Sequence, residues 1–285
     1  MTTHNLVVQS PGLAIEHAEQ LAALAQAQGV ARISNTAARL LDVQHDADTR
    51  AEVVAWADAR GVDAAFVPAG LKLAGCKVLA MDMDSTLINI ECIDEIAGVV
   101  GVKDKVSEIT EAAMRGEIKD FSESLRRRVA LLKGAPASAL EQVYEEKLRL
   151  NPGAERLIST AQSAGIKVLL VSGGFTFFTE RLRQRLNLDS AHANTLEIEN
   201  GVLTGRVLGD ILDADAKAVH LREFARTHGA ATDQIIAMGD GANDLKMLAA
   251  AGFPVAYHAK PLVRQQTRYA LNVSGLDGVL NWFES

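Results

Sequence analysis

The spacing of apolar residues divides the chain into two stretches with different predicted architectures. In residues 1–70, four short apolar runs alternate with two helical segments, in the order strand, helix, strand, strand, helix, strand. This order predicts a small α+β unit with a ferredoxin-like plan. Its strands are expected at 5–9, 31–34, 38–43 and 64–67, and its helices at 15–27 and 49–59.

Residues 71–285 follow a second pattern, and Pro68-Ala69-Gly70 is the expected linker between the two. Strand-length apolar runs alternate with helices, which predicts an α/β domain with a doubly wound, mostly parallel sheet. The strands are expected at 78–81, 167–171, 234–238, 253–256 and 269–272, with a hairpin at 197–208 and a terminal helix at 275–283.

Between the first two of these strands the pattern is purely helical, over about 92–150. Helices are expected there at 93–100, 105–114, 120–133 and 137–148. Because the apolar runs of the sheet resume only after this stretch, we expect a helical cap inserted into a core formed by 76–91 and 151–285.

Composition narrows the class of protein. The net charge of −7 disfavours a nucleic-acid or anionic-membrane partner. No apolar run approaches the ~20 residues that span a bilayer, and the N-terminus lacks the charged start and long apolar region of a signal peptide. Cys76 and Cys92 have no CxxC spacing, so reduced thiols and a cytoplasmic location are expected.

Two carboxylates follow the first core strand directly. Asp82 and Asp84 lie two residues apart, so in an extended segment both side chains project to the same side. Two carboxylates so close together repel each other. A divalent cation that binds one of them while the other holds a proton would relieve this repulsion. The alternative is a solvated turn whose acids cap a helix.

A second acidic pair follows the strand at 234–238. In Gly239-Asp240-Gly241-Ala242-Asn243-Asp244, two glycines flank one acid and another acid lies four residues on. Carboxylates at such a strand end provide the oxygen ligands that Mg²⁺ prefers. Helix capping explains one of Asp240 and Asp244 comfortably, but not both.

The strand at 167–171 ends in Ser172-Gly173-Gly174. A hydroxyl followed by glycines leaves backbone N–H groups free to approach an anion, and the next helix directs its positive end to the same place. In the expected helix 120–133, Arg128 falls at the edge of the apolar stripe. A guanidinium on an inward face needs an anionic partner, which is either Glu111 or Glu123 or a substrate.

The stretch Asp82-Met83-Asp84-Ser85-Thr86-Leu87-Ile88-Asn89-Ile90-Glu91 resembles the first motif of the haloacid dehalogenase superfamily of phosphotransferases, in the form found in the phosphoserine phosphatase family. The resemblance continues through most of residues 77–270. It implies that Asp82 is the nucleophile and Asp84 the proton donor and acceptor. It also implies a Mg²⁺ ion bound by Asp82, by the backbone carbonyl of Asp84 and by Asp240, with Asp244 in support.

The same resemblance assigns the substrate contacts. The residues implied to bind the phosphoryl oxygens are Ser172, Gly173, Lys217 and Asn243. Glu91 is implied to accept the ammonium group of the substrate, and the two-pronged guanidinium of Arg128 to bind its carboxylate. Taken alone, Lys217 is a solvated surface lysine, and only the resemblance marks it as part of a site.

The activity implied by this resemblance is Mg²⁺-dependent hydrolysis of O-phosphoserine through an aspartyl-phosphate, the last step of serine biosynthesis. The N-terminal unit resembles regulatory ACT-type modules, which leaves serine sensing, scaffolding and a homodimer through this unit open. Two other functions also stay open. One is a phosphatase for another small phosphate, or a phosphotransferase that uses an alcohol such as homoserine. The other is a non-enzymatic regulatory module that keeps a vestigial fold.

Overall fold

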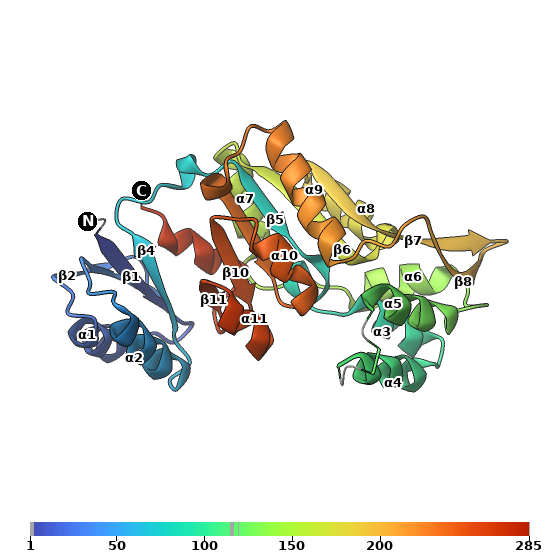
Figure 1. The fold of residues 1–285 in the computed structure, drawn as a ribbon, viewed down its shortest axis with the longest axis horizontal. Helices are drawn as coiled ribbons and strands as arrows, with labels where there is room; N and C mark the ends of the chain where they lie inside the picture. The colour runs from blue at the N-terminus through green and yellow to red at the C-terminus, as the bar shows by residue number, and fades with distance from the viewer. Residues whose placement is uncertain (1–2, 115–116, 119, 285) are drawn as a thin grey trace.

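The computed structural model of the chain describes residues 3–114, 117–118 and 120–284. It contains one sheet of four strands and one of seven. The smaller sheet and the helical cap lie at opposite ends of the molecule, with the larger sheet between them (Figure 1). Within the described part of the chain, no helix is both long and apolar enough to cross a membrane.

The N-terminal unit has the predicted ferredoxin-like plan. Its strand order is β2-β3-β1-β4, with antiparallel neighbours throughout. Its elements are β1 (His4–Gln9), α1 (Ile15–Leu24), β2 (Gly29–Arg32), β3 (Ala37–Leu41), α2 (Ala47–Asp58) and β4 (Asp63–Pro68). Leu6 and Val8 of β1 share a core with the two helices, whereas Val7, on the opposite face, joins the core of the larger unit. One face of this sheet is therefore covered by the rest of the chain.

The larger sheet is doubly wound, as predicted. Its order is β11-β10-β9-β5-β6-β7-β8, and only β8 runs antiparallel to its neighbour. The strands are β5 (Val78–Met81), β6 (Lys167–Phe175), β7 (Ser190–Glu199), β8 (Val202–Leu208), β9 (Ile235–Gly239), β10 (Phe253–Tyr257) and β11 (Tyr269–Leu271). The β7–β8 hairpin turns at Asn200-Gly201, where both residues have positive φ.

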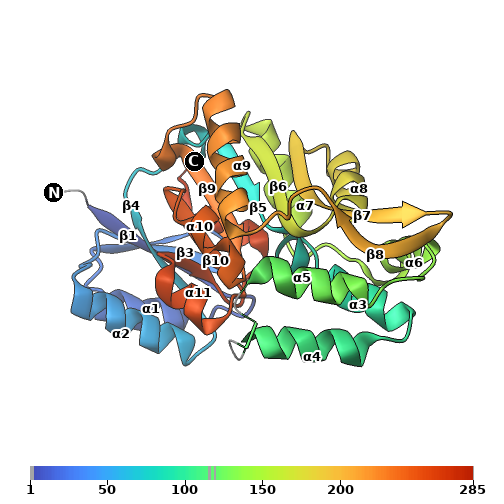
Figure 2. The ribbon, with the colours of Figure 1, turned by 45° about the vertical axis from the view of Figure 1, so that its right-hand side comes forward.

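Helices cover both faces of this sheet (Figure 2). They are α7 (Ala154–Ser163), α8 (Thr176–Leu186), α9 (Ala214–Thr227), α10 (Leu245–Leu248) and α11 (Pro261–Gln266). Leu79 and Met81 of β5 share a core with residues of α7 and α8, and Val78 and Ala80 share one with residues of α9, α10 and α11. Because β5 is apolar on both faces, it is buried as the central strand.

The cap is helical, with α3 (Cys92–Val99), α4 (Lys103–Met114), α5 (Phe121–Ala130) and α6 (Ser138–Gln142). Two predicted boundaries are wrong. The helix expected over 120–133 ends at Ala130, where the following turn leads Gly134 to donate its backbone N–H to the carbonyl of Leu203. The helix expected over 137–148 ends as α6, and a wider turn at Val143–Lys147 follows it.

The expected terminal helix at 275–283 is also wrong in type, because Leu276–Trp282 forms a 3₁₀ helix. Leu276, Val279 and Trp282 are all fully buried. Their three-residue spacing places them in line on one face of a helix with three residues per turn, which is the 3₁₀ geometry.

Hydrogen bonds from buried groups tie the N-terminal unit to the larger one. Asp63, at the start of β4, accepts backbone N–H bonds from Asn272 (2.6 Å) and Ser274 (2.8 Å), just after β11. Arg39 donates to the carbonyls of Asn281 (2.8 Å) and Phe283 (2.9 Å). The two units therefore share a specific polar seam as well as apolar contacts.

Candidate active site

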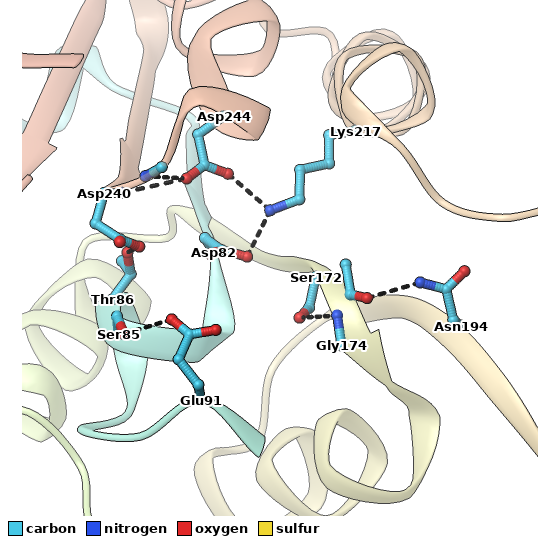
Figure 3. Close-up of polar contacts among 12 residues, drawn as sticks. Asp82, Ser85, Thr86, Glu91, Ser172, Gly174, Asn194, Lys217, Asp240 and Asp244 are labelled. Carbon is cyan, nitrogen blue, oxygen red and sulfur yellow. Dashed lines mark hydrogen bonds and ion pairs between the residues drawn. The ribbon is translucent and has the colours of Figure 1, made fainter. Parts of the chain in front are cut away.

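The polar residues predicted at strand ends meet at one edge of the larger sheet (Figure 3). Asp82 follows β5, Ser172 lies in the last part of β6, and Asp240 follows β9. These three strands are neighbours and run parallel, so their carboxyl ends open on the same side. The strand order reverses at β5, which is where ligands bind in sheets of this kind.

The turn after Asp82 is held in an unusual conformation. Ser85 has φ +56°, in the left-handed region that non-glycine residues rarely adopt. The side-chain amide of Asn151 donates to the carbonyls of Thr86 (2.8 Å) and Ile88 (3.0 Å), and the Thr86 hydroxyl donates to Asp240 (3.1 Å). The turn is thus fixed by long-range bonds. Asn151 could not be singled out from the sequence, because an asparagine beside a Pro-Gly pair is typical of an ordinary turn.

Lys217 lies at the centre of the site. Its Nζ contacts Asp82 Oδ1 at 2.6 Å and Asp244 Oδ1 at 2.7 Å, and the side chain is completely buried. The other carboxylate oxygen of Asp244 accepts the backbone N–H groups of Asp240 (3.1 Å) and Gly241 (3.0 Å). Although burial disfavours its charge, the carboxylates of Asp244 and Asp82 hold the pKa of Lys217 above its usual value. Lys217 therefore stays cationic and orients Asp82.

One lysine cannot neutralise the acids around it. Carboxylate oxygens of Asp82, Asp240 and Asp244 all lie within 4.8 Å of one another. Burial and the charge of Asp244 raise the pKa of Asp82 well above its usual range, and the same two causes raise the pKa of Asp240 to about 7. Buried acids in such a cluster have the ligand chemistry of a divalent cation site.

Asp84 has a different environment from Asp82. Its Oδ1 atom is buried and has no hydrogen-bond partner among the residues that the structure describes. Burial and the charge of Glu91 raise its pKa to about 8, so the carboxyl group can hold a proton near neutral pH. A side chain on Gly174 would lie within 3.0 Å of Asp84 Oδ2, so glycine is needed for this close approach.

The Ser-Gly-Gly loop is shaped by its own hydroxyl and by a neighbouring strand. Ser172 Oγ accepts the backbone N–H of Gly174 (2.9 Å). The buried Asn194 of β7 donates to the carbonyl of Gly173 (2.8 Å) and accepts from the backbone N–H of Leu212 (2.7 Å). Asn194 thereby links the loop to the segment before α9. Its role could not be predicted, because nothing in the strand pattern distinguishes a structural amide.

A cavity of about 300 Å³ opens between these strand ends and the cap. The predicted site residues that line it are Asp82, Asp84, Glu91, Arg128, Gly173, Asp240 and Asn243. The remaining three, Ser172, Lys217 and Asp244, are buried beside it. The structure therefore brings all ten predicted residues into one site.

The cap side of the cavity carries both acidic and basic side chains. Arg128 is partly buried, and its guanidinium lies near the charges of Asp94, Glu91 and Asp84. Burial lowers the pKa of Arg128. Glu123, one of its expected partners, pairs with Arg127 instead. Arg128 thus faces the cavity beside acids that also belong to it.

Two charged residues that line the cavity were not predicted. Asp94 lies in the first turn of α3, and its buried Oδ1 has no hydrogen-bond partner in the described part of the chain. Lys260 precedes α11 on the other side of the cavity. An acid in the first turn of a helix and a surface lysine are common in any sequence, so neither stood out.

Comparisons with known proteins agree with this geometry. A family model described as haloacid dehalogenase-like hydrolase matches residues 79–249, and a model for a domain of unknown function matches residues 6–53. A phosphoserine phosphatase from Polaromonas sp. is 56% identical over 214 residues, covering 74% of this chain and 91% of that protein.

Two solved structures extend the comparison. The crystal structure of a haloacid dehalogenase family hydrolase from Salmonella enterica serovar Typhi is similar over 99% of both chains, with TM-score 0.91 and 32% identity. A phosphoserine phosphatase solved as a phospho-aspartyl intermediate analogue covers 73% of this chain and 99% of its own, with TM-score 0.68 and 37% identity. The chain belongs to the phosphoserine phosphatase family of the haloacid dehalogenase-like hydrolases.

Proposed function

We propose that the chain hydrolyses O-phosphoserine to serine and phosphate through an aspartyl-phosphate on Asp82. The observation that carries this proposal is the juxtaposition of Asp82, held by Lys217, with a protonatable Asp84 in one small cavity. Its family membership supports the same reaction. A cavity of about 300 Å³ suits a small substrate of this size.

In the first step, a carboxylate oxygen of Asp82 attacks phosphorus while the bond from phosphorus to the serine oxygen breaks. Asp84 donates its proton to that departing oxygen, which leaves as the serine hydroxyl. A carboxyl group with a pKa of about 8 carries the required proton at neutral pH. Lys217 holds the Asp82 carboxylate in position from behind the cavity wall.

In the second step, Asp84 takes a proton from a water molecule. The resulting hydroxide oxygen attacks phosphorus and displaces the Asp82 carboxylate, which releases phosphate and restores both acids. Splitting one difficult displacement into two easier ones is the advantage of the covalent route. We assign the grip on the phosphoryl oxygens to Ser172, Gly173 and Asn243, with Lys217 adding positive charge.

The acids also fit a Mg²⁺ ion. Asp82, Asp240 and the backbone carbonyl of Asp84 would hold it, because hard oxygen ligands are the ones that Mg²⁺ prefers. Both carboxylate oxygens of Asp244 already have partners, which suits a supporting role. When bound, the ion supplies the positive charge that offsets the phosphoryl oxygens and the excess of buried acids.

We assign recognition of the amino acid to Arg128 and Glu91. The guanidinium suits a carboxylate, and the exposed carboxylate of Glu91, which accepts the Ser85 hydroxyl at 2.6 Å, suits an ammonium group. A sugar phosphate has neither group. The pair therefore favours an amino-acid substrate over other small phosphates.

The experiment that tests this function is phosphate release from L-phosphoserine with and without Mg²⁺, beside phosphothreonine, phosphocholine and a sugar phosphate. We expect Mg²⁺-dependent turnover with phosphoserine preferred. A flat profile would contradict the amino-acid substrate, and inactivity on the whole panel would favour a regulatory module.

A homodimer through the N-terminal unit, where β2 is an edge strand, stays a prediction for solution measurement.

A further inference from the structure

A second cavity lies in the seam between the N-terminal unit and the larger sheet. It has the same volume as the active-site cavity, about 300 Å³. Its walls come from α2 and β4 on one side and from α11 and the residues around β11 on the other. It is therefore a space between two units, and none of the predicted site residues lines it.

Three buried polar atoms of residues that line this cavity have no hydrogen-bond partner within residues 3–114, 117–118 and 120–284. They are Arg264 Nε, Thr267 Oγ1 and Asn272 Oδ1. Buried polar atoms in folded proteins are almost always satisfied, so a group of three around one cavity indicates a missing partner. The active-site cavity has the same signature, in Asp84 Oδ1 and Asp94 Oδ1.

The chemistry of these atoms defines the partner. Arg264 Nε can only donate, and with Arg268 it makes the cavity cationic, while Asp58 is the one acid that lines it. Asn272 Oδ1 can only accept, so the partner must also carry an N–H or O–H group. The Thr267 hydroxyl can do either.

Apart from Gln265, the rest of the wall is apolar. It consists of the side chains of Val54, Ala57, Val62, Ala64, Pro261 and Ala270. A small inorganic anion would leave this surface without contacts, whereas a carbon skeleton of a few atoms would cover it. We therefore propose that the seam cavity binds a small organic carboxylate that carries a neighbouring amino or hydroxyl group.

Such a ligand would contact both units at once, through α2 and α11. Because it binds the folded chain across the seam, it is expected to raise the melting temperature. The active-site cavity also borders α11, because Lys260, the residue before Pro261, lines it. A probe bound in the active site therefore lies next to the same helix as a probe bound in the seam cavity. The test is therefore made in Arg128→Ala protein, which weakens binding of a carboxylate at the active site.

The probes are glycine and L-lactate, with acetate as a carboxylate that lacks a donor and inorganic phosphate as an anion that lacks carbon. We expect glycine or L-lactate to shift the ¹H–¹⁵N resonance of Arg264 Nε and to raise the melting temperature by about 2 °C at tenfold excess over Kd. Thr267→Val and Arg264→Met should each weaken this binding about tenfold. Arg226→Met, on the exposed surface of α9, is the matched control and should leave it unchanged.

The resonance measurement uses no cavity variant, so the test holds even if Thr267→Val or Arg264→Met folds poorly. The proposal is overturned if neither glycine nor L-lactate moves the Arg264 resonance at about 50 mM, a range that includes weak millimolar binding. It is also overturned if acetate or phosphate binds as tightly as both probes, since the donor or the carbon skeleton would then play no part.

Discussion

Asp63 and the group formed by Asp82, Asp240 and Asp244 are all buried carboxylates, but their surroundings differ in kind. Asp63 accepts backbone N–H groups on both of its oxygens, at 2.6 and 2.8 Å, where β4 meets the residues after β11. Carboxylate oxygens of the three acids in the active site lie within 4.8 Å of one another, and Lys217 contacts two of these acids, Asp82 and Asp244. Neutral backbone donors satisfy the charge of Asp63, whereas the active site holds more negative charge than Lys217 alone can balance.

This difference separates structural from chemical use of the same side chain. A carboxylate that accepts fixed backbone N–H groups stabilises the arrangement of those groups. A cluster of like charges costs stability, and proteins tolerate it where a ligand or a reaction uses the charge. We therefore expect substitution of Asp63 to lower stability and leave activity unchanged, and substitution of Asp82 to lower activity without lowering stability.

The largest effect is expected for Asp82→Asn. It should lower kcat by roughly 10⁴-fold or more, because the amide is not a nucleophile. The melting temperature should stay the same or rise, since burial and Asp244 raise the pKa of Asp82 and make its ionised form unfavourable. Steady-state kinetics and thermal unfolding measure the two quantities. Retained turnover would contradict a catalytic role for Asp82, and a large loss of stability would mean that its role is structural.

Removal of divalent cations with a chelator is expected to abolish turnover, and Mg²⁺ should restore it. A bound ion offsets the repulsion within the acidic cluster, so Mg²⁺ at a hundredfold excess over Kd should add about 2.7 kcal/mol to the free energy of unfolding. Calorimetry in the two buffers measures this. Asp240→Asn should reduce the gain, whereas Asp63→Asn should not. An equal gain in both variants would place the ion elsewhere.

Arg128→Ala removes a positive charge from the rim of the active-site cavity and tests whether that charge binds the substrate. We expect kcat/KM for phosphoserine to fall about a hundredfold, the loss of a charge-assisted contact with the substrate carboxylate. An aryl phosphate, which has no carboxylate, should lose little. Arg127→Ala, whose guanidinium pairs with Glu123 on the surface, is the control. Equal losses for both substrates would mean that Arg128 supports the cap rather than the substrate.

The smallest effect is expected for Asp63→Asn. The amide would direct hydrogens toward backbone donors, which should lower the free energy of unfolding by about 1–3 kcal/mol. Turnover should be unchanged, because Asp63 lies in the seam and not in the active-site cavity. Chemical denaturation and kinetics measure both, with the exposed Asp210→Asn as control. A loss of turnover without a loss of stability would remove the distinction between the two kinds of carboxylate.

The sequence was sufficient for elements whose signal is local. The short apolar run of β1, the Asn200-Gly201 turn and the apolar run of β5 each follow from neighbouring residues, and their predicted arrangement is confirmed. The terminal 3₁₀ helix was predicted as an ordinary helix, because its three-residue burial is visible only against the packed core. Local pattern cannot show which neighbours a segment will meet.

The site follows the same division. Asp82, Asp84, Asp240 and Asp244 stand out because they cluster at strand ends, but Lys217 was identifiable only by family resemblance. Asn151, Asn194 and Asp63 act through hydrogen bonds to residues far away in sequence. No pattern within a short window marks such residues, since the donors and acceptors that they satisfy are created by the fold.

The most direct test of the central claim is to locate the phosphorylated residue. Protein quenched in acid during turnover of phosphoserine, and then reduced with borohydride, converts an aspartyl-phosphate to homoserine, which peptide mass spectrometry can locate. We expect homoserine at position 82, and none in Asp82→Asn protein. Homoserine at position 84, 240 or 244, or turnover with no reducible phosphoenzyme, would contradict it.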